Sequence, residues 1–207
     1  MQKKSTKRND LNQQAAESTQ AKLKKAALEA VNDLGHSEVK VADVISRAEV
    51  ARGTYYLYFK DRNDILSAVA LDFIEGLELC LSKLPVTTDL QKLLTNVMTC
   101  YVEYIVENSI AAELTFQLAS QDSTVMQSFD LLIEKWAKTA AIAISRTGST
   151  GEDLATLTQL SLPMICMLEG YFRYELRGNN KSITELKKEA EKTASMFVRI
   201  WQRAVSR

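Results

Sequence analysis

Apolar residues recur along most of this chain at spacings of three and four positions, the period of an α-helix that packs on one side. No sustained alternation of apolar and polar residues occurs, and only 7 Gly and 2 Pro interrupt the 207 residues. The pattern therefore predicts an all-α protein of about nine helices. The expected helices lie at about residues 18–34, two short ones within 41–62, then 63–83, from 88 onward, 110–120, 124–146, 152–177 and 183–205.

Several helix boundaries are marked by residues with specific backbone preferences. Gly35 follows the first apolar stripe and is expected to end that helix. The sequences Thr88-x-x-Gln91 and Ser182-x-x-Glu185 predict capping boxes at the starts of the fifth and ninth helices.

Changes in polarity divide the chain into three parts. Residues 1–16 are polar and basic with almost no apolar residue, and we expect them to form a flexible arm. Residues 17–62 are expected to form a compact N-terminal domain of three helices. Residues 63–207 are expected to form a larger helical domain.

Residues 41–62 carry the most informative pattern in the chain. An apolar stripe is followed by Val50 in a turn, and apolar positions resume at Tyr55 and Phe59, four residues apart. A second helix so short must dock on its neighbours to be stable. Because its two aromatic residues face inward, the hydroxyl and cationic residues between them must point elsewhere, which suits a groove of DNA. The pattern predicts a helix-turn-helix whose second helix enters the major groove. The first stripe consists of Val41, Val44, Ile45 and Ala48.

This segment resembles the DNA-binding domain of TetR-type bacterial transcriptional regulators. Residues 26–35 are similar to the end of that family's first helix, and residues 53–66 follow its G-T-x-Y-x-Y-F-K run into a fourth helix. The resemblance covers about residues 17–70. Two positions depart from the family's usual pattern. Glu49 replaces a turn Gly and must accept a positive φ at some strain or adjust the turn. Ala51 replaces a Ser or Thr cap, at a cost of about 1 kcal/mol of local stability.

The resemblance implies a bacterial DNA-binding transcriptional regulator, commonly a repressor, that binds a palindromic operator in double-stranded DNA as a dimer and is released by a small-molecule effector. Arg52 is the candidate for contacting base edges, since guanidinium pairs bidentately with guanine, and Gly53 allows close backbone approach. The hydroxyl groups of the second helix, Lys40 and Arg62 are expected to bind phosphates. The alternatives are solvated surface charge for the cations and partial core packing for the tyrosines. The candidate DNA-binding residues are Lys40, Arg52, Gly53, Thr54, Tyr56, Tyr58, Lys60 and Arg62.

Residues 160–172 are apolar nearly all round, with interruptions at Pro163 and Glu169. A helix that is apolar on every side must be covered on every side. The resemblance implies that the last two long helices pack against their copies in a second subunit, which makes the protein a homodimer. The alternative is that this segment is the central helix of a monomeric core.

The resemblance also implies an effector pocket in the larger domain, suited to a small and largely apolar molecule. Ordinary core packing is the alternative for each apolar candidate. Glu169 either pairs with Arg173 four residues on or faces a cavity, and the second case indicates a cationic effector. The candidate ligand-binding residues are Tyr101, Tyr104, Phe116, Trp136, Met164, Met167, Glu169 and Phe172.

The charge of the chain is distributed unevenly. The formal net charge is zero, but residues 1–62 hold 12 Lys and Arg against 8 Asp and Glu, whereas residues 63–207 hold 14 against 18. The excess of positive charge therefore lies on the part expected to meet phosphates.

The number and spacing of the cysteines and histidines limit the metal and cofactor sites that the chain can form. His36 is the sole histidine, and Cys80, Cys100 and Cys166 form no C-x-x-C pair, so we predict no metal and no cofactor. We expect all three thiols to be buried and structural.

The sequence also bears on enzymatic activity, membrane association and cellular location. No paired carboxylates, nucleophile–base set or phosphate-binding Gly loop stands out, so we predict that the chain is not an enzyme. A signal peptide and an uncharged apolar run of about 18 residues are both missing, which predicts a cytoplasmic protein without a membrane partner. The alternative function is a helical dimer that binds a small molecule and has no sequence-specific affinity for DNA.

Overall fold

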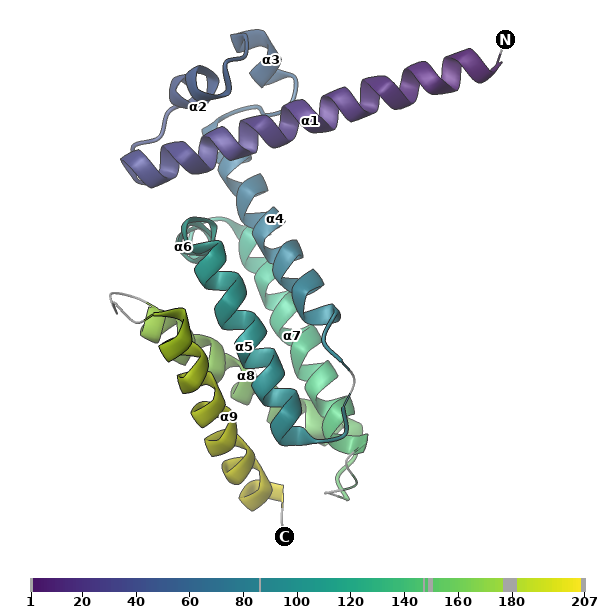
Figure 1. Ribbon diagram of the computed structural model, residues 1–207, viewed down its shortest axis with the longest axis vertical. Coiled ribbons are helices and arrows are strands. Elements are labelled where there is room, and N and C mark those ends of the chain that lie inside the picture. Colours follow the sequence, from purple (N-terminus) through teal and green to yellow (C-terminus); the bar gives the residue numbers. More distant parts are fainter. Residues whose placement is uncertain (1, 86, 147, 149–150, 177–181, 206–207) are drawn as a thin grey trace. The chain divides into compact units, whose positions relative to one another are not determined.

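The structure is a computed structural model that describes residues 2–85, 87–146, 148, 151–176 and 182–205. Its regular structure in these ranges is α-helical and includes no strand (Figure 1), which confirms the predicted fold class. The helices of the described ranges are α1 (Gln2–Leu34), α2 (Val41–Ala48), α3 (Arg52–Tyr56), α4 (Arg62–Ser82), α5 (Leu90–Glu107), α6 (Ser109–Leu118), α7 (Ser123–Arg146), α8 (Leu154–Leu176) and α9 (Ile183–Val205).

Two compact units divide the helices between them. Unit 1 comprises Met1–Phe73 and Ile110–Val125, and it contains α1, α2, α3, the first part of α4, and α6. Unit 2 comprises Ile74–Ser109 and Met126–Arg207, and it contains the rest of α4 with α5, nearly all of α7, α8 and α9. The N-terminal domain was expected to end at residue 62, where α4 begins, whereas the boundary between the units lies inside α4.

Helix α1 is longer than the hydrophobic pattern predicted. It begins at Gln2, so the helix start predicted near Ser18 was wrong, and residues 2–16 are helical where a flexible arm was expected. This segment contains no Gly or Pro and is rich in Lys, Gln and Ala, which favour helix. Periodicity could not reveal it because the segment carries almost no apolar residue. At the other end, Gly35 has a φ of 79° and ends the helix as predicted.

In unit 1, α2 packs against α1, and α4 begins beside α1 (Figure 1). Two ion pairs reinforce this packing at the surface, Arg47 with Asp33 at 2.8 Å and Lys24 with Asp72 at 2.7 Å. The predicted stripes are mostly buried, although Val41 and Ile45 of α2 are only half-buried. Buried residues of α1 and α2 include Leu23, Ala26, Ala27, Ala30, Val31, Val44 and Ala48.

In unit 2, α5 lies beside α9, and Glu103 of α5 pairs with Lys187 of α9. Glu78 of α4 pairs with Lys135 of α7. The apolar faces of α5, α7 and α8 supply most of the core between these contacts.

The two predicted capping boxes had different outcomes. The box at Thr88 was wrong, because the Asp89 carboxylate is the cap of α5 and accepts from the Lys92 backbone N–H at 3.1 Å. The box at Ser182 is confirmed. The Glu185 carboxylate accepts from the Ser182 backbone N–H at 2.8 Å, and Ser182 Oγ accepts from the Glu185 N–H at 3.3 Å.

Helix α8 has one buried side and one open side. Met164, Ile165 and Leu168 are buried, and Pro163 lies inside the helix on the exposed side. The open side carries apolar residues spaced three, four and seven apart, so it forms a continuous face. This face, called the α8 face below, consists of Leu160, Pro163, Met167 and Tyr174.

The cysteines differ from the sequence expectation. Cys80 of α4 and Cys100 of α5 form a disulfide, and Cys166 of α8 is a free, exposed thiol. The prediction of three buried structural thiols was therefore wrong.

None of the helices in the described ranges has the length and hydropathy that a membrane span requires. The described residues also place no three His, Cys, Asp or Glu side chains where they could hold a metal ion together.

Candidate functional site

Helix α3 is anchored in unit 1 by two buried aromatic rings. Tyr55 has no exposed surface and Phe59 is 3% exposed, which confirms the predicted inward side of this helix. The Tyr55 hydroxyl donates to the backbone carbonyl of Asp61 at 2.9 Å, so the ring also fixes the segment that follows α3. Burial of the phenol, and then the nearby Asp61 carboxylate, raises the pKa of Tyr55 to about 12.

The outer side of α3 presents a cation, hydroxyl groups and an unobstructed backbone. Arg52 and Gly53 are exposed, Tyr56 is 46% exposed, and Thr54 and Tyr58 are half-buried. The Arg52 guanidinium carbon lies 5.7 Å from the centroid of the Tyr56 ring, close enough for a cation–π contact. A Cβ built at Gly53 meets nothing within 4 Å, so a ligand can approach the backbone there. These residue types suit a polyanionic surface.

The turn before α3 contains the two departures from the expected pattern. Glu49 takes the left-handed conformation, with φ 50° and ψ 44°, so the turn keeps its shape and the residue bears the strain. Ala51 is the N-cap of α3 and supplies no side-chain hydrogen bond. The structure therefore takes the first of the two alternatives for Glu49, and it confirms that Ala51 stands at the cap position, whereas the stability cost of the missing cap stays a prediction.

Replacing Glu49 by Gly should stabilise the protein by about 0.5–1 kcal/mol, because Gly adopts positive φ without the steric cost of a Cβ. The Glu49 side chain is 84% exposed, and its contact with Lys22 at 4.0 Å contributes little. Urea unfolding should show a higher midpoint with an unchanged slope. Glu49→Ala removes the same contact but keeps the Cβ, so it should give no gain. An equal gain in both variants would contradict the strain explanation.

Lys40 and Lys60 flank the helix-turn-helix and are both exposed. The Lys40 backbone N–H donates to the Asp43 carboxylate at 2.8 Å, and the Lys60 backbone N–H donates to the Asp64 carboxylate at 2.8 Å. These bonds fix the two backbones at the starts of α2 and α4. The ammonium groups lie at the surface, as phosphate contacts require.

Arg62 has an internal partner. Its guanidinium donates to the backbone carbonyl of His36, in the turn after α1, and to Asn63 Oδ1 at 3.4 Å. The side chain is half-buried and joins the start of α4 to that turn. This contact supports the geometry of the domain, and a phosphate contact by Arg62 stays a prediction.

Leu57 is a surface residue that the sequence analysis missed. It follows α3 directly and is 79% exposed, between the candidate contacts Tyr56 and Tyr58. A helical pattern assigns a leucine to the core by default. Its position between the inward-facing rings of Tyr55 and Phe59 was the feature of the sequence that indicates an outward side chain.

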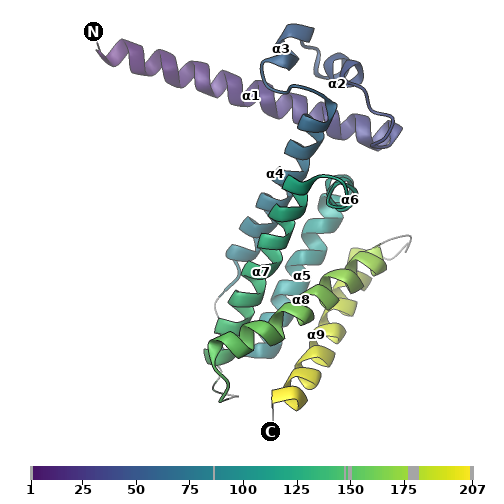
Figure 2. The same ribbon diagram turned by 180° about the vertical axis from the view of Figure 1, so that it is seen from behind.

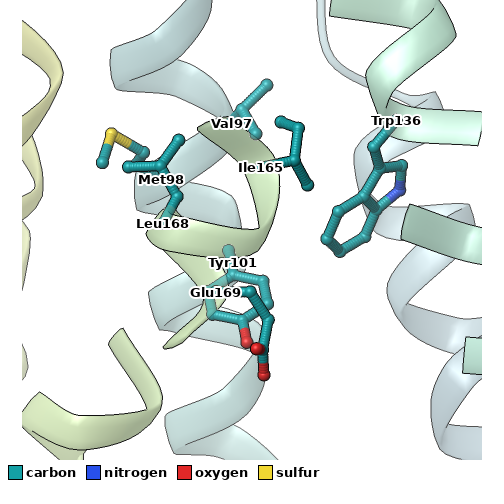
Figure 3. Close-up of a pocket in the computed structure, with 7 residues that line it drawn as sticks. All are labelled: Val97, Met98, Tyr101, Trp136, Ile165, Leu168 and Glu169. Carbon is teal, nitrogen blue, oxygen red and sulfur yellow. The ribbon is translucent and has the colours of Figure 1, made fainter. Parts of the chain in front are cut away.

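A small cavity lies in unit 2 between α5, α7 and α8 (Figure 3). Its volume is ≈ 30 Å³, room for roughly two water molecules. The rings of Tyr101 and Trp136 meet edge to face with centroids 6.0 Å apart. The Glu169 side chain is 7% exposed and its Oε1 lies 3.4 Å from Arg173 Nε. Burial raises the pKa of Tyr101 well above its usual value of 10. The lining residues are Val97, Met98, Tyr101, Trp136, Ile165, Leu168 and Glu169.

The candidate ligand residues are only partly brought together. Tyr101, Trp136 and Glu169 line the cavity, and Glu169 both pairs with Arg173 and borders the empty space. The other candidates do not line it: Met164 is buried, Tyr104 and Phe116 are half-buried, Met167 is 55% exposed, and the Phe172 side chain lies outside the described residues. Four further lining residues were not predicted, because they carry no polar group that separates them from core residues: Val97, Met98, Ile165 and Leu168.

The fold and the surface of α3 define a helix-turn-helix protein with a separate helical body. Residues 23–69 match the family model described as bacterial regulatory proteins of the tetR family. Residues 23–69, which include the whole helix-turn-helix, are therefore similar to the DNA-binding segment of TetR-type regulators. This match supports the prediction of a regulator and not an enzyme.

Relatives share the N-terminal segment. YvdT of Bacillus subtilis (strain 168), an uncharacterised HTH-type transcriptional regulator, is 34% identical over 62 residues, which cover 27% of this chain and 32% of YvdT. YxbF of the same organism is 34% identical over 61 residues, which cover 30% of this chain and 16% of YxbF. The matched part therefore spans a third or less of these curated relatives.

Solved structures share the fold over nearly the whole chain. The TetR family transcriptional regulator PfmR from Thermus thermophilus is similar with a TM-score of 0.67 and 16% identity, over 86% of this chain and 97% of that one. The fatty acid degradation regulator FadR from Bacillus halodurans is similar with a TM-score of 0.58 and 15% identity, over 85% and 94%. At such identities the likeness shows the fold alone.

Proposed function

We propose that this chain is a transcriptional repressor that binds a palindromic operator in double-stranded DNA as a homodimer and leaves it when a small-molecule effector binds. The observation that carries the proposal is the outer surface of α3, where Arg52, Gly53 and Tyr56 are exposed while Tyr55 is buried beneath them. A helix held in this way can enter the major groove without disturbing the core.

Each outward residue of α3 has a distinct role in this proposal. Arg52 contacts base edges, because a guanidinium matches the two acceptors of guanine. Thr54, Tyr56 and Tyr58 donate hydroxyl hydrogen bonds to phosphates. Leu57 lies against the groove floor, where its apolar side chain suits a thymine methyl group.

The proposed dimer forms through the open sides of α8 and α9 (Figure 2). The α8 face is apolar, with Met167 55% exposed and Tyr174 72% exposed. On α9, Met196 and Ile200 are 45% and 52% exposed and lie one turn apart. Apolar faces on two consecutive long helices are what a bundle with a second copy would cover.

The proposed effector enters unit 2 at the cavity beside Tyr101. Its volume of ≈ 30 Å³ is smaller than a ligand needs, so binding requires α5, α7 and α8 to separate. An apolar molecule would bind the opened state better than the closed one, and this difference in affinity is what shifts the population. The switch is disproved if a saturating effector leaves operator affinity unchanged.

Salt dependence tests the DNA-binding part. Lys40→Ala should weaken binding to every sequence about equally and reduce the slope of log affinity against log salt by about 1, because one phosphate contact is lost. The measurement is fluorescence anisotropy on an operator selected from genomic fragments of the source organism. Lys138→Ala, which removes an exposed cation of α7, is the matched control and should leave the slope unchanged. Weak binding at every salt concentration would instead favour a small-molecule-binding dimer without specific affinity for DNA.

A further inference from the structure

Helices α4 and α5 approach closely along a seam formed by Gly76, Cys80, Cys100 and Tyr104. A Cβ built at Gly76 would lie 3.1 Å from Tyr104 Cζ and closer still to its hydroxyl, so a larger residue would displace that ring. One turn further along α4 and one turn back along α5, Cys80 and Cys100 are bonded. From the Gly76–Tyr104 contact to the Cys80–Cys100 bond, the residue numbers rise along α4 and fall along α5. The disulfide therefore continues the antiparallel packing that Gly76 permits.

We propose that Cys80 and Cys100 form a reversible oxidation site whose substrate is a small-molecule disulfide. Their Cα atoms are 6.9 Å apart, and they lie on helices whose register is set by the neighbouring Gly76 contact. Cys100 is 6% exposed, whereas Cys80 is half-buried near the end of α4. A reagent therefore reaches Cys80 first, and Cys100 completes the bond from inside the seam.

The reaction is two thiol–disulfide exchanges. The Cys80 thiolate attacks one sulfur of the small disulfide, forms a mixed disulfide and expels one small thiolate. The Cys100 thiolate then attacks the Cys80 sulfur and expels the second. The protein loses two electrons and two thiol protons, and the small disulfide gains both as two small thiols. A dithiol reductant reverses the sequence.

The product links the end of α4 to α5 by a covalent bond. The cysteines are 20 positions apart, so the bond closes a ring of that size and restricts the unfolded chain. Helix α4 runs from Arg62 to Ser82 and is shared by both units, so a restraint on its end acts on the helix that follows the helix-turn-helix. The effect on the helix-turn-helix rests on the proposed function. Reversibility rests on it too, because a disulfide in a compartment with DNA and reducing thiols is typically transient.

Thiol counting tests the site without DNA. In a Cys166→Ser background, protein reduced with dithiothreitol should carry two reactive thiols after unfolding. After treatment with glutathione disulfide it should carry none, with peptide mapping placing the bond between Cys80 and Cys100. The oxidised form should melt roughly 5–10 °C higher, and dithiothreitol should remove the shift. Cys80→Ser in the same background is the matched control and should show no shift. Glutathione retained on both cysteines, thiols that stay free, or bonds between two chains would each overturn the proposal.

Operator affinity tests the consequence for α4. The reduced and oxidised forms of the Cys166→Ser protein should differ at least about threefold in affinity, and the Cys80→Ser control should not respond to glutathione disulfide. Equal affinities in both forms would overturn the effect on α4. Lack of specific binding in either form would contradict the proposed function and not the thiol site, which the thiol count decides by itself.

Discussion

Met167→Glu should convert the protein from a dimer to a monomer without unfolding it. Met167 is 55% exposed in the single chain, so a carboxylate there stays solvated and costs little. In the proposed dimer the α8 face is covered, and two carboxylates would be buried near each other. The cost of such burial is at least about 3 kcal/mol, which weakens dimerisation more than a hundredfold. Sedimentation should show a monomer, circular dichroism should show unchanged helix content, and operator affinity should be reduced; the melting temperature should lose only the part that dimerisation contributes.

Leu131→Glu is the matched control for this experiment. Leu131 lies on α7 and is 65% exposed, so the same charge is introduced at a comparable apolar position outside the α8 face. Its dimerisation should equal that of the wild type. A Met167→Glu protein that remains dimeric would contradict the proposed interface, and a monomeric wild type would contradict the homodimer itself.

Arg52→Ala should relax the sequence preference at one base pair of each half-site by about 1–3 kcal/mol, the usual discrimination of a bidentate guanidinium–guanine contact. The exposed position of Arg52 on α3 makes loss of folding stability small. The measurement is selection of bound sequences from a randomised half-site, followed by affinities for the operator and its single-base variants.

Arg52→Lys separates the charge from the shape of the guanidinium. Lysine keeps the positive charge but cannot form the planar pair of hydrogen bonds. The variant should therefore lose the base preference while keeping the salt dependence of the wild type. If Arg52→Ala instead weakened all sequences equally, the residue would be a phosphate contact and the assignment to base edges would be wrong.

The helix-turn-helix was predictable because its signals are local. The spacing of Tyr55 and Phe59 fixes which side of a short helix is buried, whatever the rest of the chain does. Glu49 could be assigned to the turn in the same way, but the sequence left open whether it adopts a positive φ or the turn adjusts, and the structure shows the positive φ. The length of α1 was not predicted, because a segment with high helix propensity but no apolar periodicity does not show where the helix begins.

The cavity and the α4–α5 seam were not predictable because they depend on which helices become neighbours. Val97 and Leu168 look like ordinary core residues until α5 and α8 are placed around the same space. Cys80 and Cys100 sit in different helical patterns, and only the antiparallel packing of α4 and α5 brings them together. Arg62 was assigned to phosphate from the family resemblance, whereas its hydrogen bond to His36 requires the turn after α1 to lie next to the start of α4.

Pro163 has a consequence for the mechanics of α8. A proline has no amide hydrogen, so the backbone hydrogen bond from its nitrogen to the carbonyl of Gln159 cannot form. The energy needed to bend a helix is lowest where a backbone hydrogen bond is absent. The two halves of α8 can therefore tilt against each other about Pro163. The half that borders the cavity can yield to an entering molecule while the other half keeps its position, which concentrates any deformation at a single turn.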